Sequence, residues 1–187
     1  GPITTYMASG YVPTQETMFR GVHKQLPGHS MQVSPRGIRA NVYWTLHYVP
    51  DRARQSDQTA RELRALLQDA VRIHLRSDVP VGVLLSGVLE SSASVALLAV
   101  SGVSRINTFS VAYREGEEYD ETKYARLVAK RFGTVHNELY VDPAKFRDFI
   151  PSYVWHMDEP VTEAAAIWLY FISKLLREHV VVAISGE

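Results

Sequence analysis

The turn at residues 86–92, Ser-Gly-Val-Leu-Glu-Ser-Ser, combines residue types that suit phosphate binding. It follows a continuous apolar run at residues 81–85 and precedes an apolar stretch of helical length at residues 93–100. A turn from a strand into a helix directs free backbone N–H groups at one point, where the helix dipole adds positive potential. Gly87 would let the backbone approach an anion, and the serine hydroxyls could donate to its oxygens. The spacing alone fits a phosphate cradle and a simple serine-capped turn equally well, and no Gly-Lys-Ser/Thr of a Walker loop follows.

A second Ser-Gly turn, at residues 185–187, follows another apolar run at residues 180–184. Strand and helix patterns alternate throughout this part of the chain. The predicted strands are residues 81–85, 106–111, 135–141 and 180–184, and the predicted helices are residues 57–75, 93–100, 120–132, 143–155 and 163–179. This order predicts an α/β fold with an open parallel sheet covered by helices on both faces. Ligands of such sheets bind beyond the carboxyl ends of the strands, where both turns would lie.

Several residues are candidates for ending these helices. Ser56 or Asp57 could cap the helix of residues 57–75, and Asp120 could cap that of residues 120–132. Gly133 is expected to end the latter helix, and Asp142-Pro143 to begin the next one.

Before residue 56 the pattern is different. Proline and glycine recur at short intervals between short apolar stretches such as residues 31–33 and 42–44. This composition predicts an arm of small strands and turns at residues 1–55, leading into a domain at residues 56–187. Gly1-Pro2 is expected to be left over from the removal of a tag.

The composition excludes several classes of protein. Twenty Lys and Arg balance twenty Asp and Glu, which argues against a broad cationic face for nucleic acid. The absence of cysteine excludes disulfides, thiolate zinc sites and a cysteine nucleophile, and it fits a reducing compartment. The longest apolar run, residues 79–85, is too short to span a membrane. We therefore expect a cytoplasmic protein that binds neither nucleic acid nor membrane.

Residues 78–92 resemble the pyrophosphate-binding loop of the asparagine synthetase (glutamine-hydrolysing) family, which usually reads SGGLDSS. Further stretches resemble that family in the same order along the chain. They are residues 10–13, 19–22, 26–29, 108–111, 119–121, 124–126, 133–136, 157–160 and 185–187. The resemblance implies the C-terminal synthetase domain, an N-type ATP pyrophosphatase with an adenine nucleotide alpha hydrolase-like (HUP) fold, preceded by the arm between the family's two domains.

The resemblance also implies a reaction. In this family the side-chain carboxylate of aspartate attacks the α-phosphate of ATP, pyrophosphate leaves, and β-aspartyl-AMP remains. Ammonia, released from glutamine in a separate glutaminase domain, then displaces AMP to give asparagine. The implied partners are these small molecules and the missing glutaminase domain, and a homodimer is retained among the candidate assemblies.

The roles of individual residues follow from their motif positions. Leu85 and Val111 would flank the adenosine, and Ser185 and Gly186 would bind the nucleotide. The pyrophosphate-binding positions are Ser86, Gly87, Val88, Glu90, Ser91 and Ser92. Glu187 would act as the base for incoming ammonia. A magnesium ion would bridge the phosphates with Asp158 and Glu90 as candidate ligands, although Asp158 could equally be a turn former before Glu159-Pro160.

Two positions depart from the family pattern. Val88 stands where the family has its second glycine, and Glu90 stands where it has aspartate. A positive φ would be an outlier for a β-branched valine, and the longer side chain of Glu90 shifts its charge. These changes predict weakened pyrophosphate binding, and we expect the chain alone, as a truncated part of a longer protein, to show no turnover.

Other interpretations remain open. The parent protein could activate another carboxylate, as β-lactam synthetases and peptide cyclases do, or it could be a non-catalytic relative. An adenylate-binding module without ligation is a third alternative. His136 and His156 have no partners at metal-ligand spacing and are expected to be structural.

Overall fold

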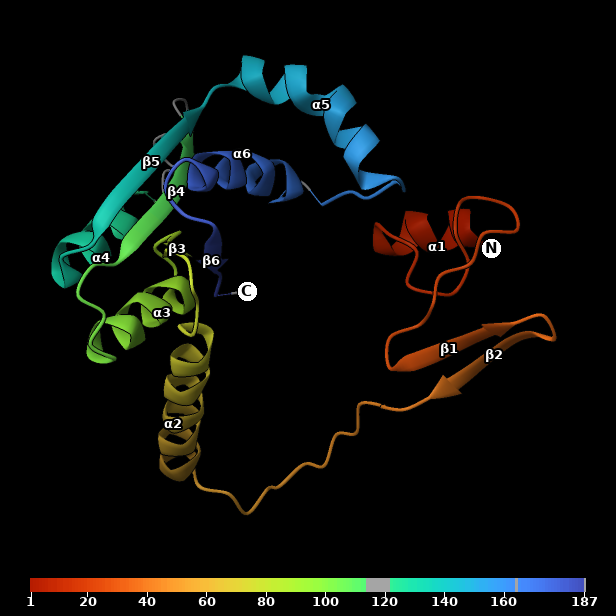
Figure 1. The fold of residues 1–187 in the computed structure, drawn as a ribbon, viewed down its shortest axis with the longest axis horizontal. Coiled ribbons are helices and arrows are strands. Elements are labelled where there is room, and N and C mark those ends of the chain that lie inside the picture. Colours follow the sequence, from red (N-terminus) through yellow and green to blue (C-terminus); the bar gives the residue numbers. More distant parts are fainter. Residues whose placement is uncertain (114–121, 164, 187) are drawn as a thin grey trace. The chain divides into compact units, whose positions relative to one another are not determined.

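The computed structural model describes residues 1–113, 122–163 and 165–186, and the chain forms two compact units. The first unit consists of Gly1–Ala53 and Pro151–Glu163, and the second of Arg54–Ile150 and Ala164–Glu187. Each unit has its own strands, which are labelled along the chain in Figure 1.

The second unit is built on a four-stranded sheet. Its strands are β3 (Val81–Leu84), β4 (Asn107–Tyr113), β5 (Val135–Val141) and β6 (Val182–Ile184). They lie in the order β5-β4-β3-β6, and every neighbouring pair is parallel (Figure 1). The predicted parallel sheet is thereby confirmed. The chain steps outward from β3 to β4 and β5 and then returns to the other side of β3, so the strand order reverses between β3 and β6.

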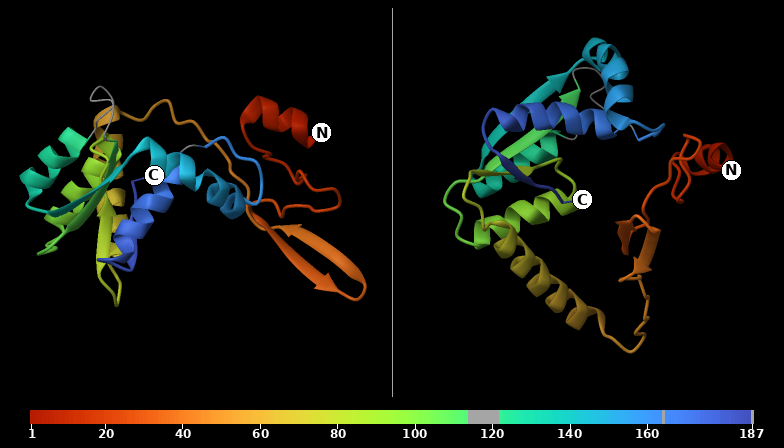
Figure 2. Two further views of the ribbon diagram at one scale, coloured as in Figure 1. Left: turned by 90° about the horizontal axis from the view of Figure 1, so that it is seen from above. Right: turned by 45° about the vertical axis from the view of Figure 1, so that its right-hand side comes forward.

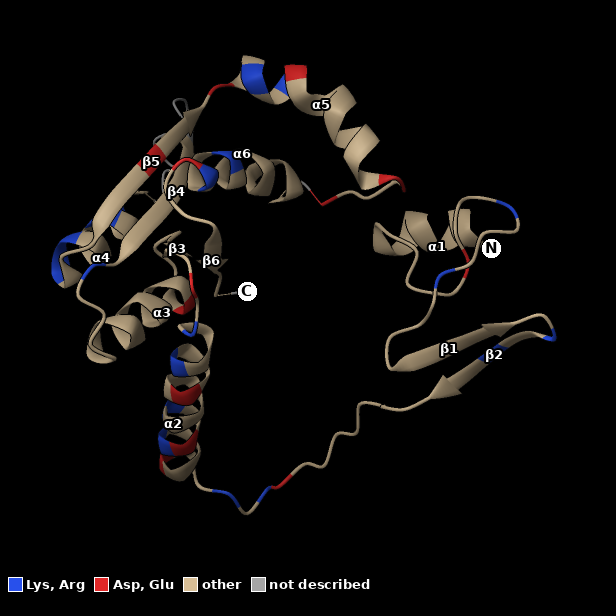
Figure 3. Ribbon diagram, in the orientation of Figure 1, with Lys and Arg blue, Asp and Glu red and all other residues tan. Residues whose placement is uncertain are grey.

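Helices cover both faces of this sheet, as the sequence predicts. The helices α2 (Ser56–His74), α3 (Leu89–Val100) and α4 (Thr122–Phe132) contribute to the core on one face. The helix α6 (Ala165–Arg177) packs on the opposite face, and Figure 2 shows the sheet between the two helical layers. Acidic and basic residues intermingle along α2 (Figure 3), which accords with the balanced charge of the chain.

Alternation along β3 gives each face its core. Val83 and Leu85 are buried with Val95 and Leu98 of α3, and fully burying each such side chain contributes about 1.5–3 kcal/mol. On the other face Leu84 packs against a cluster that contains the fully buried Phe109 of β4 and that α6 completes. β3 is therefore buried on both sides, which explains its unbroken apolar sequence.

Glycine in β3 makes room for the larger of these side chains. A Cβ at Gly82 would lie 2.6 Å from the ring of Phe109 and 2.9 Å from Val180. The absence of a side chain at position 82 therefore lets the Phe109 ring lie against the strand.

Two of the predicted helix boundaries are confirmed. Gly133 follows α4 with a φ of 64°, and the N–H of Thr134 donates to the Ala129 carbonyl at 3.0 Å. Asp142 caps α5 (Pro143–Met157), because its Oδ1 accepts from the N–H of Lys145 at 2.8 Å. Asp120 lies outside the described residues.

Other boundaries differ from the prediction. The N-cap of α2 is Gln55, and no side chain caps that helix. Ser56 and Asp57 already lie within its first turn, so neither can be the extended residue that precedes a helix. The helix α3 begins at Leu89, four residues before the apolar pattern, and β6 is shorter than the apolar run of residues 180–184.

The first unit contains an antiparallel hairpin of β1 (His29–Ser34) and β2 (Gly37–Val42). Residues 31–33 lie within β1, whereas residues 42–44 only begin at the end of β2, and the helix α1 (Pro2–Ser9) lies where the sequence predicts strands and turns. Residues 151–163 join this unit through side-chain contacts: Lys24 pairs with Glu159 at 3.0 Å and donates to the Val12 carbonyl at 2.7 Å. None of the described helices is long and apolar enough to cross a membrane.

Candidate functional site

The turn at residues 86–92 leaves the carboxyl end of β3, and its start is fixed to β4. The N–H of Leu85 donates to the Phe109 carbonyl at 2.8 Å, and the Ser110 hydroxyl donates to the Leu85 carbonyl. Both backbone polar groups of Leu85 are thus bonded within the sheet. The turn begins from a rigid point, a feature that preorganised binding sites require.

Gly87 is required by both the conformation of the turn and its surroundings. Its φ is 95°, a region that residues with a side chain rarely adopt. A Cβ at this position would lie 2.6 Å from the Ala125 nitrogen and 2.8 Å from the Tyr124 Cβ. The turn therefore packs directly against the first turn of α4, a contact with no signature in the local sequence.

Ser91 holds the turn together. Its side chain is buried, and its Oγ accepts from the Gly87 N–H at 3.2 Å and donates to the Val88 carbonyl at 3.2 Å. The Ser86 hydroxyl lies 2.9 Å from the same oxygen. Because Ser91 gives its one hydrogen to Val88, Ser86 donates to Ser91, and both hydroxyls and the Gly87 N–H are engaged within the turn. Ser86 is nevertheless exposed, and Ser92 is half-buried.

Val88 adopts an ordinary backbone conformation. Its φ of −72° and ψ of 172° are extended, so the strain that a positive φ would impose on valine does not arise. Val88 is the N-cap of α3, and no side chain caps that helix. The valine side chain is 42% exposed, and Glu90 is exposed in the first helical turn. Any effect of Val88 on a ligand must therefore come from the volume of its side chain.

The two Ser-Gly turns lie side by side. β3 and β6 are parallel neighbours, with Val83 opposite Ile184, so both turns leave the same edge of the sheet. A Cβ at Gly186 would lie 3.0 Å from the carbonyl carbon of Glu90 and from the nitrogen of Ser91. Because the strand order reverses between these two strands, the turns meet at the position where open α/β sheets bind their ligands.

The remaining candidate residues are distributed differently. Leu85 is buried in the core on the α3 side, whereas Val111 packs against the cluster on the α6 side, so their side chains lie on opposite faces of the sheet. Ser185 is exposed beyond β6, and Glu187 lies outside the described residues. Asp158 belongs to the first unit, where it has a φ of 57°. Within the described parts of the chain, no three His, Asp or Glu residues gather at a metal-binding distance.

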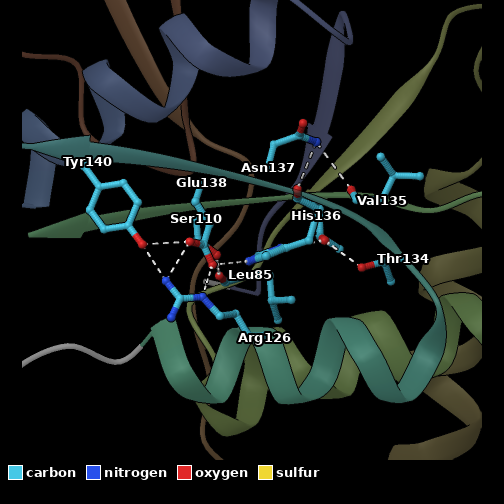
Figure 4. Close-up of polar contacts among 10 residues, drawn as sticks. Leu85, Ser110, Arg126, Thr134, Val135, His136, Asn137, Glu138 and Tyr140 are labelled. Atoms are coloured by element: carbon cyan, nitrogen blue, oxygen red, sulfur yellow. Dashed lines mark hydrogen bonds and ion pairs between the residues drawn. The ribbon is translucent and has the colours of Figure 1, made fainter.

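A polar network lies on β5, close to α4 (Figure 4). Arg126 of α4 donates to both carboxylate oxygens of Glu138, from Nε at 2.7 Å and from Nη2 at 2.8 Å. Glu138 also accepts from the Tyr140 hydroxyl at 2.9 Å and lies 3.1 Å from the Nε2 of His136. On the other side of its ring, the Nδ1 of His136 lies 2.9 Å from the Thr108 hydroxyl.

These contacts set the titration of the two ionisable groups on β5. Burial lowers the pKa of His136, against the opposing influence of Glu138. The hydrogen bond from Arg126 lowers the pKa of Glu138, with Tyr140 acting in the same direction. At neutral pH the network therefore holds a carboxylate beside a neutral imidazole.

Comparison with known proteins identifies the family. Residues 62–187 match the asparagine synthase family, and the chain belongs to it. Its members include ATP-dependent carbon–nitrogen ligases that are named asparagine synthetases, as the resemblance of the turn and of its neighbouring motifs had indicated.

The chain is similar to several named proteins. Glutamine-hydrolysing asparagine synthetase 1 of Bacillus subtilis (strain 168) is 35% identical over 97% of this chain and 28% of its own length. Asparagine synthetase 3 of the same organism is 28% identical over 91% of the chain and 30% of its own length. Amidase chyE of Penicillium rubens is also 28% identical, over 91% of the chain and 28% of its own length. The chain thus spans less than a third of each of these relatives.

Proposed function

We propose that the protein containing this chain uses ATP to activate the side-chain carboxylate of aspartate and then amidates it to asparagine. A carboxylate oxygen bonds to the α-phosphorus, the bond from that phosphorus to the bridging oxygen breaks, and pyrophosphate leaves. The nitrogen of ammonia then attacks the carbonyl carbon and AMP departs. Ammonia would come from glutamine in a glutaminase domain of the same protein. Membership of the asparagine synthase family supports this proposal.

The single observation that carries the nucleotide site is the contact between the two Ser-Gly turns. Gly186 lies against the backbone of Glu90 and Ser91 at the reversal of strand order. Displacement at phosphorus depends mainly on positioning and on donors aimed at the phosphate oxygens. The uncapped start of α3 supplies such donors at this edge, and Ser86 is exposed beside it.

Within this site each residue has a proposed role. Ser86, Gly87, Ser91 and Ser92 would hold the pyrophosphate, with Ser91 shaping the turn from within. The adenosine would lie near Leu85 and Val111, and Ser185 and Gly186 would bind the nucleotide on the β6 side. Because the backbone groups of Leu85 are bonded within the sheet, its contribution would be shape rather than hydrogen bonding. Glu187 would accept a proton from the attacking ammonia.

A magnesium ion fits the chemistry of this edge. Mg²⁺ keeps several waters and needs only one or two protein carboxylates beside phosphate oxygens. Glu90, exposed in the first turn of α3, would be such a ligand. Asp158, the other candidate by motif position, belongs to the first unit. The bound ion would neutralise charge that develops on the leaving pyrophosphate.

Val88 and Glu90 support a second candidate, a relative that keeps the fold for protein contacts and has lost turnover. The argument rests on the volume of the Val88 side chain at the mouth of the turn and on the added methylene of Glu90. Since the backbone of Val88 is unstrained, we expect weakened rather than abolished nucleotide binding.

Calorimetric titration of the full-length protein with Mg·ATP tests the proposal. Binding that strengthens in a Val88→Gly, Glu90→Asp double variant is expected, together with pyrophosphate exchange into ATP that depends on aspartate. Exchange that depends on a different carboxylate would assign another substrate. If neither the unaltered protein nor the double variant binds Mg·ATP, the nucleotide site is refuted. Binding of Mg·ATP without pyrophosphate exchange would favour the non-catalytic candidate.

The division of the sequence into an arm at residues 1–55 and a synthetase domain at residues 56–187 is part of this proposal. The 187-residue chain alone is expected to release no pyrophosphate from ATP. Measurable release by the purified chain would contradict this expectation.

A further inference from the structure

The network on β5 lies outside the proposed nucleotide site, yet it fixes the helix against which the phosphate turn packs. We propose that Arg126 is a positioning residue for the turn at residues 86–92 and acts through α4. The inference rests on the proposed function only for the identity of the ligand that the turn binds. The mechanical link between Arg126 and Gly87 follows from contacts within the second unit.

The first part of that link is a two-point attachment of α4 to β5. Arg126 donates from Nε and Nη2 to the two oxygens of Glu138, at 2.7 and 2.8 Å, and also donates to the Tyr140 hydroxyl. A guanidinium bound to a carboxylate at two points fixes direction as well as distance, which a lysine ammonium cannot do. The pair thus sets the position of α4 along the strand.

The acceptor is itself held rigidly. The side chain of Glu138 is only 17% exposed and is bonded to Tyr140 and His136, its neighbours on the same face of β5. His136 is fixed in turn by the Thr108 hydroxyl of β4, which also lies 2.8 Å from the Thr134 hydroxyl. A carboxylate held by the sheet in this way gives Arg126 a stationary partner.

The second part of the link runs from Arg126 to the turn. Tyr124 and Ala125 immediately precede Arg126 in α4, and their backbone and Cβ atoms leave no space for a side chain at Gly87. Gly87 is joined to Ser91 by the hydrogen bond from its N–H to the serine hydroxyl. A shift of α4 along its axis would therefore be transmitted to Gly87, and from there to the start of α3.

A purely structural role would give a different result. The side chain of Arg126 is 48% exposed, and pairs that involve exposed charges contribute little to global stability. Removing the pair should consequently affect the geometry of the turn more than the free energy of unfolding. Pyrophosphate binding should weaken, whereas AMP, which lacks the leaving group, should bind nearly as before.

The experiment compares Arg126→Gln and Arg126→Lys with Arg72→Gln in the full-length protein. Arg72 is the control, since it pairs with Asp69 on the surface of α2 at 2.7 Å and forms no hydrogen bond or ion pair with the turn among the described residues. Affinities for inorganic pyrophosphate with Mg²⁺ and for AMP are measured by calorimetry. Hydrogen exchange is followed in peptides that cover residues 85–92.

We expect Arg126→Gln to weaken pyrophosphate binding about ten-fold, within the usual range of coupling between sites. The affinity for AMP should be unchanged, and hydrogen exchange at residues 85–92 should be faster. Arg126→Lys should recover only part of the lost pyrophosphate affinity. Equal rates of hydrogen exchange at residues 85–92 in Arg126→Gln and Arg72→Gln would overturn the proposed link between Arg126 and the turn. This outcome does not depend on whether the protein binds nucleotide. If exchange is faster but the unaltered protein binds neither ligand, the link stands and the proposed function fails.

Discussion

Replacing Gly87 with alanine would test the contact that ties the phosphate turn to α4. At a φ of 95° an alanine is strained, and a left-handed conformation costs an L-residue about 1–2 kcal/mol. The new Cβ would also lie 2.6 Å from the Ala125 nitrogen and 2.8 Å from the Tyr124 Cβ. Overpacking of this kind costs about 1–3 kcal/mol, and here the neighbours are backbone or close to it. Gly87→Ala should therefore destabilise the protein by about 2–5 kcal/mol.

Gly102 offers a matched control for the strain alone. Its φ is 82°, and an added Cβ would meet nothing within 4 Å. Both substitutions reduce the freedom of the unfolded chain by the same amount, so that effect cancels in the comparison. Gly102→Ala should cost only the conformational part, about 1–2 kcal/mol.

Urea denaturation followed by circular dichroism would measure the two free energies of unfolding. In a protein of this size, each kcal/mol corresponds to about 2–4 °C in melting temperature, so a thermal scan gives a second reading. If the two variants lose the same stability to within about 0.5 kcal/mol, the proposed packing of the turn on α4 is wrong.

Three further predictions concern side chains. Ser91→Ala should lower the free energy of unfolding by about 1–3 kcal/mol, because it leaves the Gly87 N–H without its buried acceptor. The control Ser94→Ala removes an exposed hydrogen bond within α3 and should change urea denaturation little. Asp142→Ala should cost about 1 kcal/mol through loss of the α5 cap, and equal loss in Ser56→Ala, which is no cap, would contradict the assignment. Burial lowers the pKa of His136 below the 6.5 of an exposed histidine, so the unfolded state binds more protons in that window. The contribution of the neutral His136 to the free energy of unfolding is therefore complete above pH 6.5 and is lost as the pH falls through the folded-state pKa. Melting temperatures measured against pH should show this decline in the unaltered protein and lack it in His136→Gln.

The sequence was most informative where one local signal determined the structure. The unbroken apolar run that includes Val83, flanked by proline and glycine, is typical of a strand buried on both faces, which the structure confirms. Asp142 before a proline and Gly133 after an amphipathic helix act within one turn of the chain, and both boundaries are confirmed. The alternation of strands and helices likewise predicts the parallel order.

The sequence was least informative where distant segments decide the outcome. Val88 was expected to be strained, but Gly87 takes the positive φ and leaves Val88 extended. The hydroxyl of Ser91 looks like a free phosphate donor in the sequence, yet the folded turn uses it internally. Contacts across more than thirty residues, such as that between Gly87 and Tyr124, have no local signature that could predict them.

The two outer strands of the sheet differ in how they meet solvent. β5 carries histidine, asparagine, glutamate and tyrosine over seven residues, and such polar edges resist pairing with another chain. β6 is only three residues long, which limits the edge that it offers, but it pairs with β3 alone among the described strands and has Val182 and the preceding Val181 exposed. The purified 187-residue chain should consequently associate through β6 as its concentration rises. A lysine in place of Val181 should delay the onset of light scattering.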